Sequence, residues 1–191
     1  RQPFSNDPRV VAPITAMLLE SREAVVNYSM PLGLHHIMAT GHHYGPGPWV
    51  SDQKRADWNP VYYHRADATG LGFNRTATGS DALAQYAPEV ARQWADLATC
   101  PDEFLLWFHH VPWDYRMRSG RTLWDELCLH YQHGVESVRG WQKTWDSLQG
   151  QIDAERFAHV QGLLVRQERD AREWRDACTQ YFATFSKMPL H

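Results

Sequence analysis

Apolar positions repeat at helical spacing near both ends of the sequence and lose that spacing in between. Asp7 is a suitable N-cap and Pro8 a tolerated first-turn residue, so residue 7 to about 28 is predicted as a helix within a helical segment 1–29. Pro13 lies inside this pattern and predicts a kink or a restart. The apolar stripe consists of Val10, Val11, Ile14, Met17, Leu18 and Val25.

The strongest helical pattern covers residues 119–191. Thr122 and Asp125 resemble a capping box at its start, and Gly150 and Asp153 break the pattern and recap the chain. Two long helices joined by a short turn are therefore predicted, as an antiparallel hairpin. Its apolar stripes are Trp124, Leu127, Tyr131, Val135, Val138, Trp145 and Leu148, then Phe157, Val160, Leu164, Ala171, Trp174, Cys178, Tyr181 and Phe185.

The middle of the chain has another character. Residues 30–79 are rich in Gly, Pro and aromatic residues and keep no regular period, which predicts a long irregular loop. Residues 80–118 predict short helices, with Pro88 interrupting a helix over 80–98. The apolar run 104–108 fits either a strand or a buried helix. The expected fold class is mainly α.

Composition narrows the range of functions. The chain has 191 residues and a formal net charge of −3, which argues against a dedicated nucleic-acid-binding protein. No apolar run approaches the roughly 18 residues of a membrane span. Three widely spaced cysteines, Cys100, Cys128 and Cys178, are predicted to be reduced and buried. They slightly favour a cytoplasmic location, although an exported protein also fits.

Two histidine pairs, His35-His36 and His42-His43, lie in the irregular segment. Imidazole nitrogens are common metal ligands, so the pairs suggest a metal site, as in a small metal hydrolase. The segment has no HExxH motif and no evident carboxylate ligand. Histidines that are hydrogen-bonded or contact a substrate are therefore preferred, and neither a metal nor a cofactor is predicted.

The same segment holds a run in which Gly and Pro alternate with aromatic residues, from Gly41 to Trp49. Such a backbone is rigid and allows close approach, and it presents Tyr44 and Trp49 as flat surfaces. A sugar-binding site needs such surfaces together with a few directed polar groups. A loop pinned between domains explains the run equally well, and the pattern leaves both interpretations open.

A third cluster lies between Trp107 and Arg118. Asp114 beside His109 and His110 suggests acid–base chemistry. An ion pair of Asp114 with Arg116 or Arg118 is the more common outcome for such a cluster, and it is the expected one. No nucleophile motif and no phosphate-binding motif is present.

Longer strings carry a resemblance. The sequence is similar to glycoside hydrolase family 67, the microbial xylan α-glucuronidases, over essentially its whole length. The strings are Met30-Pro31-Leu32-Gly33-Leu34-His35-His36, Gly41-His42-His43-Tyr44-Gly45-Pro46-Gly47-Pro48-Trp49, Tyr62-Tyr63-His64-Arg65-Ala66-Asp67, Leu105-Leu106-Trp107-Phe108-His109-His110-Val111-Pro112-Trp113-Asp114-Tyr115-Arg116 and Trp174-Arg175-Asp176-Ala177-Cys178.

This resemblance implies a fragment of a larger enzyme. The family has an N-terminal α/β domain, a central (β/α)8 catalytic barrel and a mainly helical C-terminal region, and residues 1–191 resemble the last of these. The family removes α-1,2-linked 4-O-methyl-D-glucuronic acid from xylooligosaccharides with inversion, which requires an acid and a base carboxyl group. Those groups lie on the barrel. No residue here matches them, so no catalytic residue is predicted and the chain alone is expected to be inactive.

The resemblance also implies partners and substrate contacts. The region is expected to contact the barrel and the N-terminal domain and to form a homodimer. In the family one tryptophan of the C-terminal region helps to shield the sugar, and Trp49 is the best match, followed by Trp58. His42, His43 and Tyr44 are weaker candidates. The alternative interpretation is a free-standing carbohydrate-binding or protein-interaction module.

Overall fold

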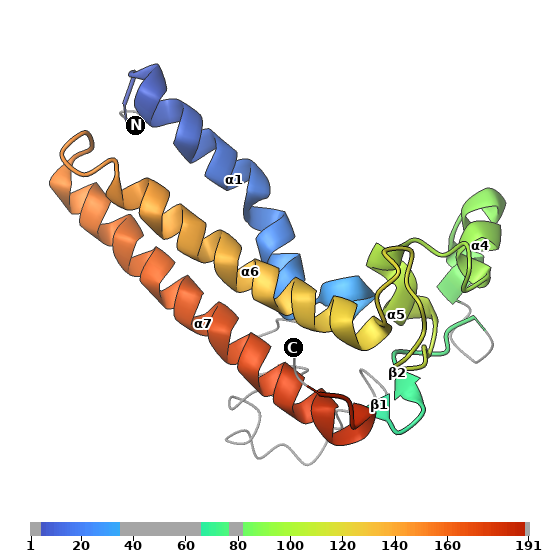
Figure 1. Ribbon diagram of the computed structural model, residues 1–191. Helices are drawn as coiled ribbons and strands as arrows, with labels where there is room; N and C mark the ends of the chain where they lie inside the picture. Colours follow the sequence, from blue (N-terminus) through green and yellow to red (C-terminus); the bar gives the residue numbers. More distant parts are fainter. Residues whose placement is uncertain (1–4, 35–65, 77–81, 190–191) are drawn as a thin grey trace, which may run out of the picture.

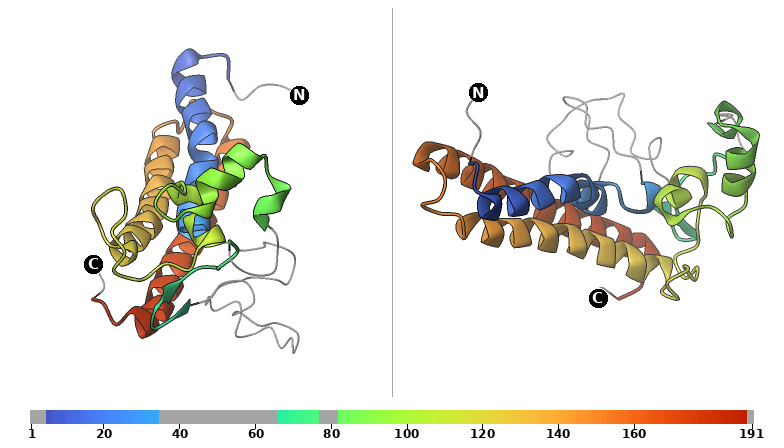
Figure 2. Two further views of the ribbon diagram at one scale, coloured as in Figure 1. Left: turned by 90° about the vertical axis from the view of Figure 1, so that its right-hand side faces the viewer. Right: turned by 90° about the horizontal axis from the view of Figure 1, so that it is seen from above.

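Three long helices form the main body of the molecule (Figure 1). The computed structural model describes residues 5–34, 66–76 and 82–189. Helix α1 (Pro8–Ser29) and helix α7 (Ala154–Ser186) run in one direction, and helix α6 (Leu123–Asp146) runs in the other. The mainly α fold and the antiparallel hairpin of α6 and α7 are thus confirmed. Helix α1 packs along this hairpin and contacts both of its helices (Figure 2).

Helix α1 begins and ends close to its predicted bounds. The Asp7 carboxylate accepts a hydrogen bond from the backbone N–H of Arg9 at 2.9 Å and caps the helix. The helix continues through Pro13, so the alternative of a restart at this residue was wrong. Pro13 removes one N–H in the second helical turn, and the surrounding turns hold the helix together. After Ser29 the chain turns through a short 3-10 helix, η1 (Pro31–Gly33).

The hairpin is stabilised by caps and by the predicted apolar stripes. Thr122 accepts a hydrogen bond from the N–H of Asp125 at 3.1 Å, and Asp153 accepts one from the N–H of Arg156 at 3.0 Å. Gly150 has a φ of +79° in the turn between the helices, a conformation that favours glycine. Both caps and the turn therefore follow the sequence prediction.

Buried aromatic residues join the three helices. Trp124 and Tyr131 of α6 are fully buried, as is Phe182 of α7. Indole N–H groups donate across the bundle: Trp145 to the Phe157 carbonyl at 3.1 Å and Trp141 to the Glu20 carboxylate at 3.2 Å. These contacts explain the tryptophans of the helices as core residues.

A smaller part lies at the end of the bundle where α6 begins and α7 ends (Figure 1). It contains strands β1 (Ala66–Asp67) and β2 (Gly70–Leu71), which pair antiparallel with Ala66 opposite Leu71. The irregular loop expected over 30–79 is therefore wrong at these residues, which form a short hairpin. Two-residue strands are too short to show alternation, and Asp67 forms the turn by accepting the Thr69 N–H at 2.8 Å.

Short helices complete the smaller part. They are η2 (Ala82–Gln85), α4 (Pro88–Ala95), η3 (Asp102–Phe104) and α5 (Leu105–Phe108). The apolar run 104–108 is therefore helical, and α4 begins at Pro88, where the helical pattern was expected to be interrupted. In the part of the chain that the structure describes, no helix is long and apolar enough to cross a bilayer.

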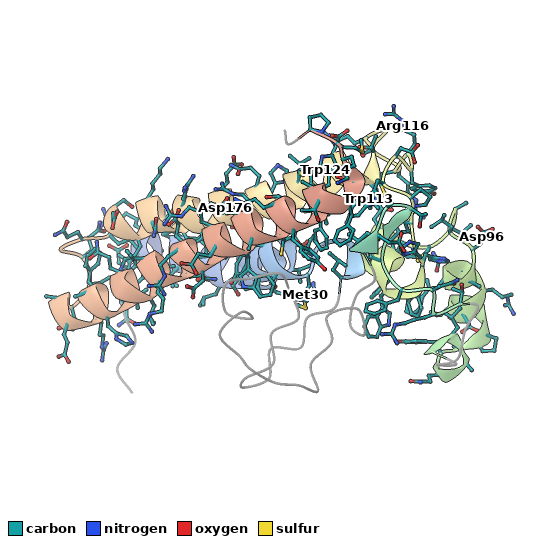
Figure 3. All side chains as sticks on the ribbon, turned by 90° about the horizontal axis from the view of Figure 1, so that it is seen from below. Met30, Asp96, Trp113, Arg116, Trp124 and Asp176 are labelled. Atoms are coloured by element: carbon teal, nitrogen blue, oxygen red, sulfur yellow. The ribbon has the colours of Figure 1, made fainter. Side chains whose placement is uncertain are left out.

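Trp113 connects the smaller part to the helical bundle. Its indole N–H donates to the Asp67 carbonyl at 2.8 Å, and its ring meets Trp124 edge-to-face at 6.0 Å and Phe182 at 6.1 Å. Figure 3 shows Trp113 and Trp124 close together where the two parts meet. One side chain thereby links β1, α6 and α7.

Candidate functional site

The residues expected to contact substrate lie outside the described residues. His42, His43, Tyr44, Trp49 and Trp58 all belong to segment 35–65, as do the His35-His36 and His42-His43 pairs. Their roles therefore stay predictions. Within the described ranges, no cluster of three His, Cys, Asp or Glu side chains is arranged to hold a metal ion.

The predicted acid–base cluster is instead a structural junction. The ring of His109 is buried, and its Nε2 lies 2.8 Å from the Trp94 carbonyl oxygen. The Nδ1 of His110 lies 3.0 Å from the Gly72 carbonyl oxygen, and its Nε2 lies 3.3 Å from Oδ1 of Asp67. The two imidazoles thus connect the end of α5 to α4 and to the β hairpin, and these contacts engage Nε2 of His109 and both ring nitrogens of His110.

The expected ion pair of Asp114 with a neighbouring arginine is not formed among the described residues. Arg118 lies 3.8 Å from Asp102 and donates to the Cys100 carbonyl at 2.9 Å. Arg116 donates to the Gly120 carbonyl at 2.9 Å and extends from the outer tip of the molecule (Figure 3). Both guanidinium groups thus have other partners, and Asp114 is exposed.

The three cysteines are free and buried, as predicted. Burial raises the pKa of the Cys100 thiol to about 11 and those of Cys128 and Cys178 to about 12. Thiols with such pKa values stay protonated near neutral pH, and the thiolate is the reactive form. These cysteines are therefore core residues and not nucleophiles.

A groove of about 600 Å³ lies between the last turns of α1 and the smaller part. Its volume falls within the range of small-molecule sites, roughly 300–1,000 Å³. Aromatic and apolar side chains form its walls, and charged groups from two elements join them. The lining residues are Arg22, Glu23, Val26, Met30, Gly33, Leu34, Tyr86, Glu103, Phe104 and Trp107.

Aromatic contacts fix the wall on the side of the smaller part. Trp107 meets Phe73 edge-to-face at 5.8 Å, and the Arg75 guanidinium lies 4.0 Å from the centre of the Trp107 ring. Trp94 lies 4.7 Å from both Tyr86 and Phe104, measured between ring centres. Because His109 binds the Trp94 carbonyl, it acts as a positioning residue beneath this wall.

The opposite wall comes from α1. Val26 and Met30 supply apolar surface, and Arg22 and Glu23 have well-exposed side chains. The groove can accept a flat, partly apolar molecule with hydroxyl groups, because aromatic faces stack on such rings while carboxylates accept from hydroxyls. These residue types match what a sugar site requires.

Sequence reasoning did not find this groove. Its walls come from residues 22–34 and 86–107, which are far apart in the chain and carry no joint motif. The sequence did contain one indication of an apolar surface outside the core. Val26 and Met30 are apolar but do not belong to the stripe of α1 that faces the core. Gly33 brings the two walls together, because a Cβ on it would lie 2.9 Å from the Phe104 carbonyl carbon.

Comparisons with known proteins complete the description. The family model described as "Glycosyl hydrolase family 67 C-terminus" matches residues 1–191. The chain is 37% identical to a probable alpha-glucuronidase A of Aspergillus clavatus over 190 residues, 97% of this chain. It is 37% identical to alpha-glucuronidase A of Emericella nidulans over 189 residues and 35% identical to that of Aspergillus tubingensis over 193. In each case it spans only 22% of the relative's length.

Proposed function

Because the chain belongs to glycosyl hydrolase family 67, whose C-terminal part it matches from end to end, we propose that it acts as the C-terminal accessory region of an α-glucuronidase. The parent enzyme removes 4-O-methyl-D-glucuronic acid that is α-1,2-linked to xylooligosaccharides, with inversion. The observation that carries this proposal is the 35–37% identity to alpha-glucuronidases over nearly the whole chain.

The reaction itself belongs to the rest of the enzyme. The chain spans about a fifth of its relatives' length, and its described residues offer no secluded pair of carboxyl groups in the groove. The side chain of Glu23 is 66% exposed, and Glu103 is exposed too. Inverting hydrolysis needs one carboxyl group as acid and another as base on opposite faces of the sugar. We therefore expect no hydrolytic activity from the 191 residues alone.

The region contributes to the substrate pocket through its irregular segment. Trp49 shields the sugar, with Trp58 next in order and His42, His43 and Tyr44 as weaker contributors. This assignment rests on the family resemblance of the Gly/Pro-rich string. Its partners are the barrel and the N-terminal domain of the parent enzyme.

The helical region also joins two copies of the enzyme. Support comes from α7, where two large apolar side chains on either side of the buried Leu164 reach solvent, Leu163 being 45% and Val165 57% exposed. Sedimentation of the full-length enzyme with Val165→Lys tests this role. A monomer in place of a dimer is the expected result, and an unchanged dimer contradicts it.

The central test compares the full-length enzyme with the 191-residue chain. Release of 4-O-methylglucuronic acid from substituted xylooligosaccharides is measured for both at equal concentration. We expect turnover by the full-length enzyme alone. Hydrolysis by the 191-residue chain would refute the accessory role, and a full-length enzyme without this activity would refute the proposed reaction.

The groove favours a second candidate function, a carbohydrate-binding module. Tyr86, Phe104 and Trp107 line it together with the exposed carboxylates, as such a module requires. This function predicts that the 191-residue chain binds unsubstituted xylooligosaccharides in calorimetry and that Trp107→Ala abolishes the binding. The accessory role predicts no binding by the chain alone.

A further inference from the structure

Residues 10–19 of α1 are apolar on all sides of the helix apart from Thr15. Residues 10–19 read VVAPITAMLL and contain no charged side chain. Val10 is buried in the bundle, and Ile14 and Met17 pack against the core. On the other side, Leu18 is 69% and Leu19 79% exposed. A helix that is apolar all round is normally covered on both sides, so we expect a further surface to pack on the outer side of α1.

The outer surface of α7 provides the comparison within the same bundle. From residue 166 onward it carries many charged side chains, exposed or half-buried, which form ion pairs along the helix, such as Arg169 with Asp170 at 3.1 Å and Arg175 with Asp176 at 2.7 Å. Such a surface is stable in water. This face of α7 is therefore charged and suited to solvent, whereas the exposed face of α1 is apolar.

We call this surface the α1 outer face. It leads directly into the groove, since Leu19, Glu23, Val26 and Met30 follow one another at helical spacing along the same side of α1. Alanines one turn apart allow close approach of another element. The α1 outer face consists of Val11, Ala12, Thr15, Ala16, Leu18 and Leu19, all of which are exposed.

We propose that the α1 outer face is the surface on which this region packs against the part of the parent enzyme that lies outside these 191 residues. The proposal rests on the proposed function, because it requires that parent enzyme. The chain matches 22% of its relatives' length, so nearly four-fifths of such an enzyme is attached to this region. A covalent link gives an effective concentration of about millimolar, well above that of a second copy in solution. The partner surface is uncharged and apolar, to match residues 10–19.

Thiol labelling of the full-length enzyme tests whether the face is covered. Leu19→Cys is reacted with a maleimide, and Gln149→Cys in the exposed turn between α6 and α7 serves as the matched control. Mass spectrometry of the peptides identifies the labelled position. Cys100, Cys128 and Cys178 are buried and give little background. We expect Leu19→Cys to react at least about tenfold more slowly than Gln149→Cys, as for a site that opens only rarely. Equal rates would overturn the proposal.

A second variant distinguishes the parent chain from a second copy. Leu19→Lys in the full-length enzyme is expected to lower the thermal midpoint and to leave the oligomeric state unchanged in sedimentation. Loss of the dimer by a folded Leu19→Lys enzyme would overturn the proposal in favour of a second copy. Leu19→Gln is the milder change if Leu19→Lys is insoluble. Activity toward substituted xylooligosaccharides is measured separately, so failure of the proposed reaction is recognised independently of the labelling result.

Discussion

At the scale of single residues, Gly134 sets how closely α1 and α6 approach. A Cβ at this position would lie 2.6 Å from the Tyr28 Cβ and 2.7 Å from the Tyr28 nitrogen. Because the second of these atoms is backbone, no side-chain rotation relieves the clash, and the two helices would have to separate. Helix packing in this bundle therefore depends on one glycine.

We expect Gly134→Ala to lower the free energy of unfolding by about 1–3 kcal/mol through overpacking. Gly140 lies on the same helix, and a Cβ added to it would meet no other atom within 4 Å, so Gly140→Ala is the control. It should raise stability by up to about 1 kcal/mol, because alanine is the better helix former. Urea denaturation measures both, and equal effects of the two changes would contradict this account.

The surroundings of His130 lead to a prediction about how stability depends on pH. Its Nδ1 lies 2.7 Å from Oδ1 of Asn27, and it is surrounded by Glu126, His133, Glu23 and Asp102. Burial lowers the pKa of His130 from its ordinary value, and the nearby carboxylate of Glu126 opposes this shift. The folded state therefore prefers the neutral imidazole.

As the pH falls below about 6.5, the unfolded chain takes up a proton at His130 more readily than the folded chain. Through His130, acidification therefore lowers the free energy of unfolding. This loss is complete once the pH is below the folded-state pKa of His130. His130→Gln should flatten the fall in urea midpoint between about pH 7 and pH 5. His159→Gln, at an exposed position of α7 that is not among the charged neighbours of His130, is the control. The same slope in all three proteins would refute the prediction.

At the scale of elements, caps and turns determine where each helix begins, and aromatic contacts determine how the elements meet. The α6–α7 hairpin depends on Gly150 in the turn and on Asp153 at the start of α7. The smaller part depends on His109, His110 and Trp113, each of which binds a backbone carbonyl of another element. Local signals thus define the hairpin, whereas long-range contacts define the smaller part.

Asp153→Ala removes the side-chain acceptor for the Arg156 N–H. We expect a loss of about 1 kcal/mol in the free energy of unfolding, as for other N-caps. Asp153→Ser keeps an acceptor and should recover most of that loss. Chemical denaturation followed by circular dichroism measures the series, and no difference between alanine and serine would show that the cap does not limit stability.

At the scale of the whole molecule, the chain has two apolar surfaces that do not contribute to the core of its own helical bundle. The groove and the α1 outer face lie on connected parts of α1, and both present apolar side chains toward solvent. An accessory region of a larger enzyme explains both. Under the proposed function, we expect such a region to add to catalysis by shaping the substrate pocket from outside the catalytic domain.

Trp49→Ala in the full-length enzyme tests that contribution. If the indole shields the sugar, kcat/KM should fall about 10- to 100-fold, which corresponds to the roughly 1.5–3 kcal/mol of burying a large apolar side chain. Trp58→Ala is the comparison and should have the smaller effect. Wild-type kcat and KM in Trp49→Ala would remove Trp49 from the substrate pocket.

The sequence by itself determined the helices and turns that have strong local signals. It also determined the family. Helical periodicity, the caps at Asp7, Thr122 and Asp153 and the turn at Gly150 act between neighbouring residues, so they can be recognised without a fold. The long strings shared with family 67 identified the chain because they are far more specific than any short motif.

Only the tertiary structure decided what packs against what. Residue types at 109–118 suggested acid–base chemistry, yet the fold places His109 and His110 against backbone carbonyls and Arg118 beside Asp102. The groove joins residues 22–34 to 86–107, and the exposed side of α1 is defined by where α6 and α7 do not reach. Such features depend on contacts between residues distant in the chain, which no local pattern of apolar and polar positions encodes.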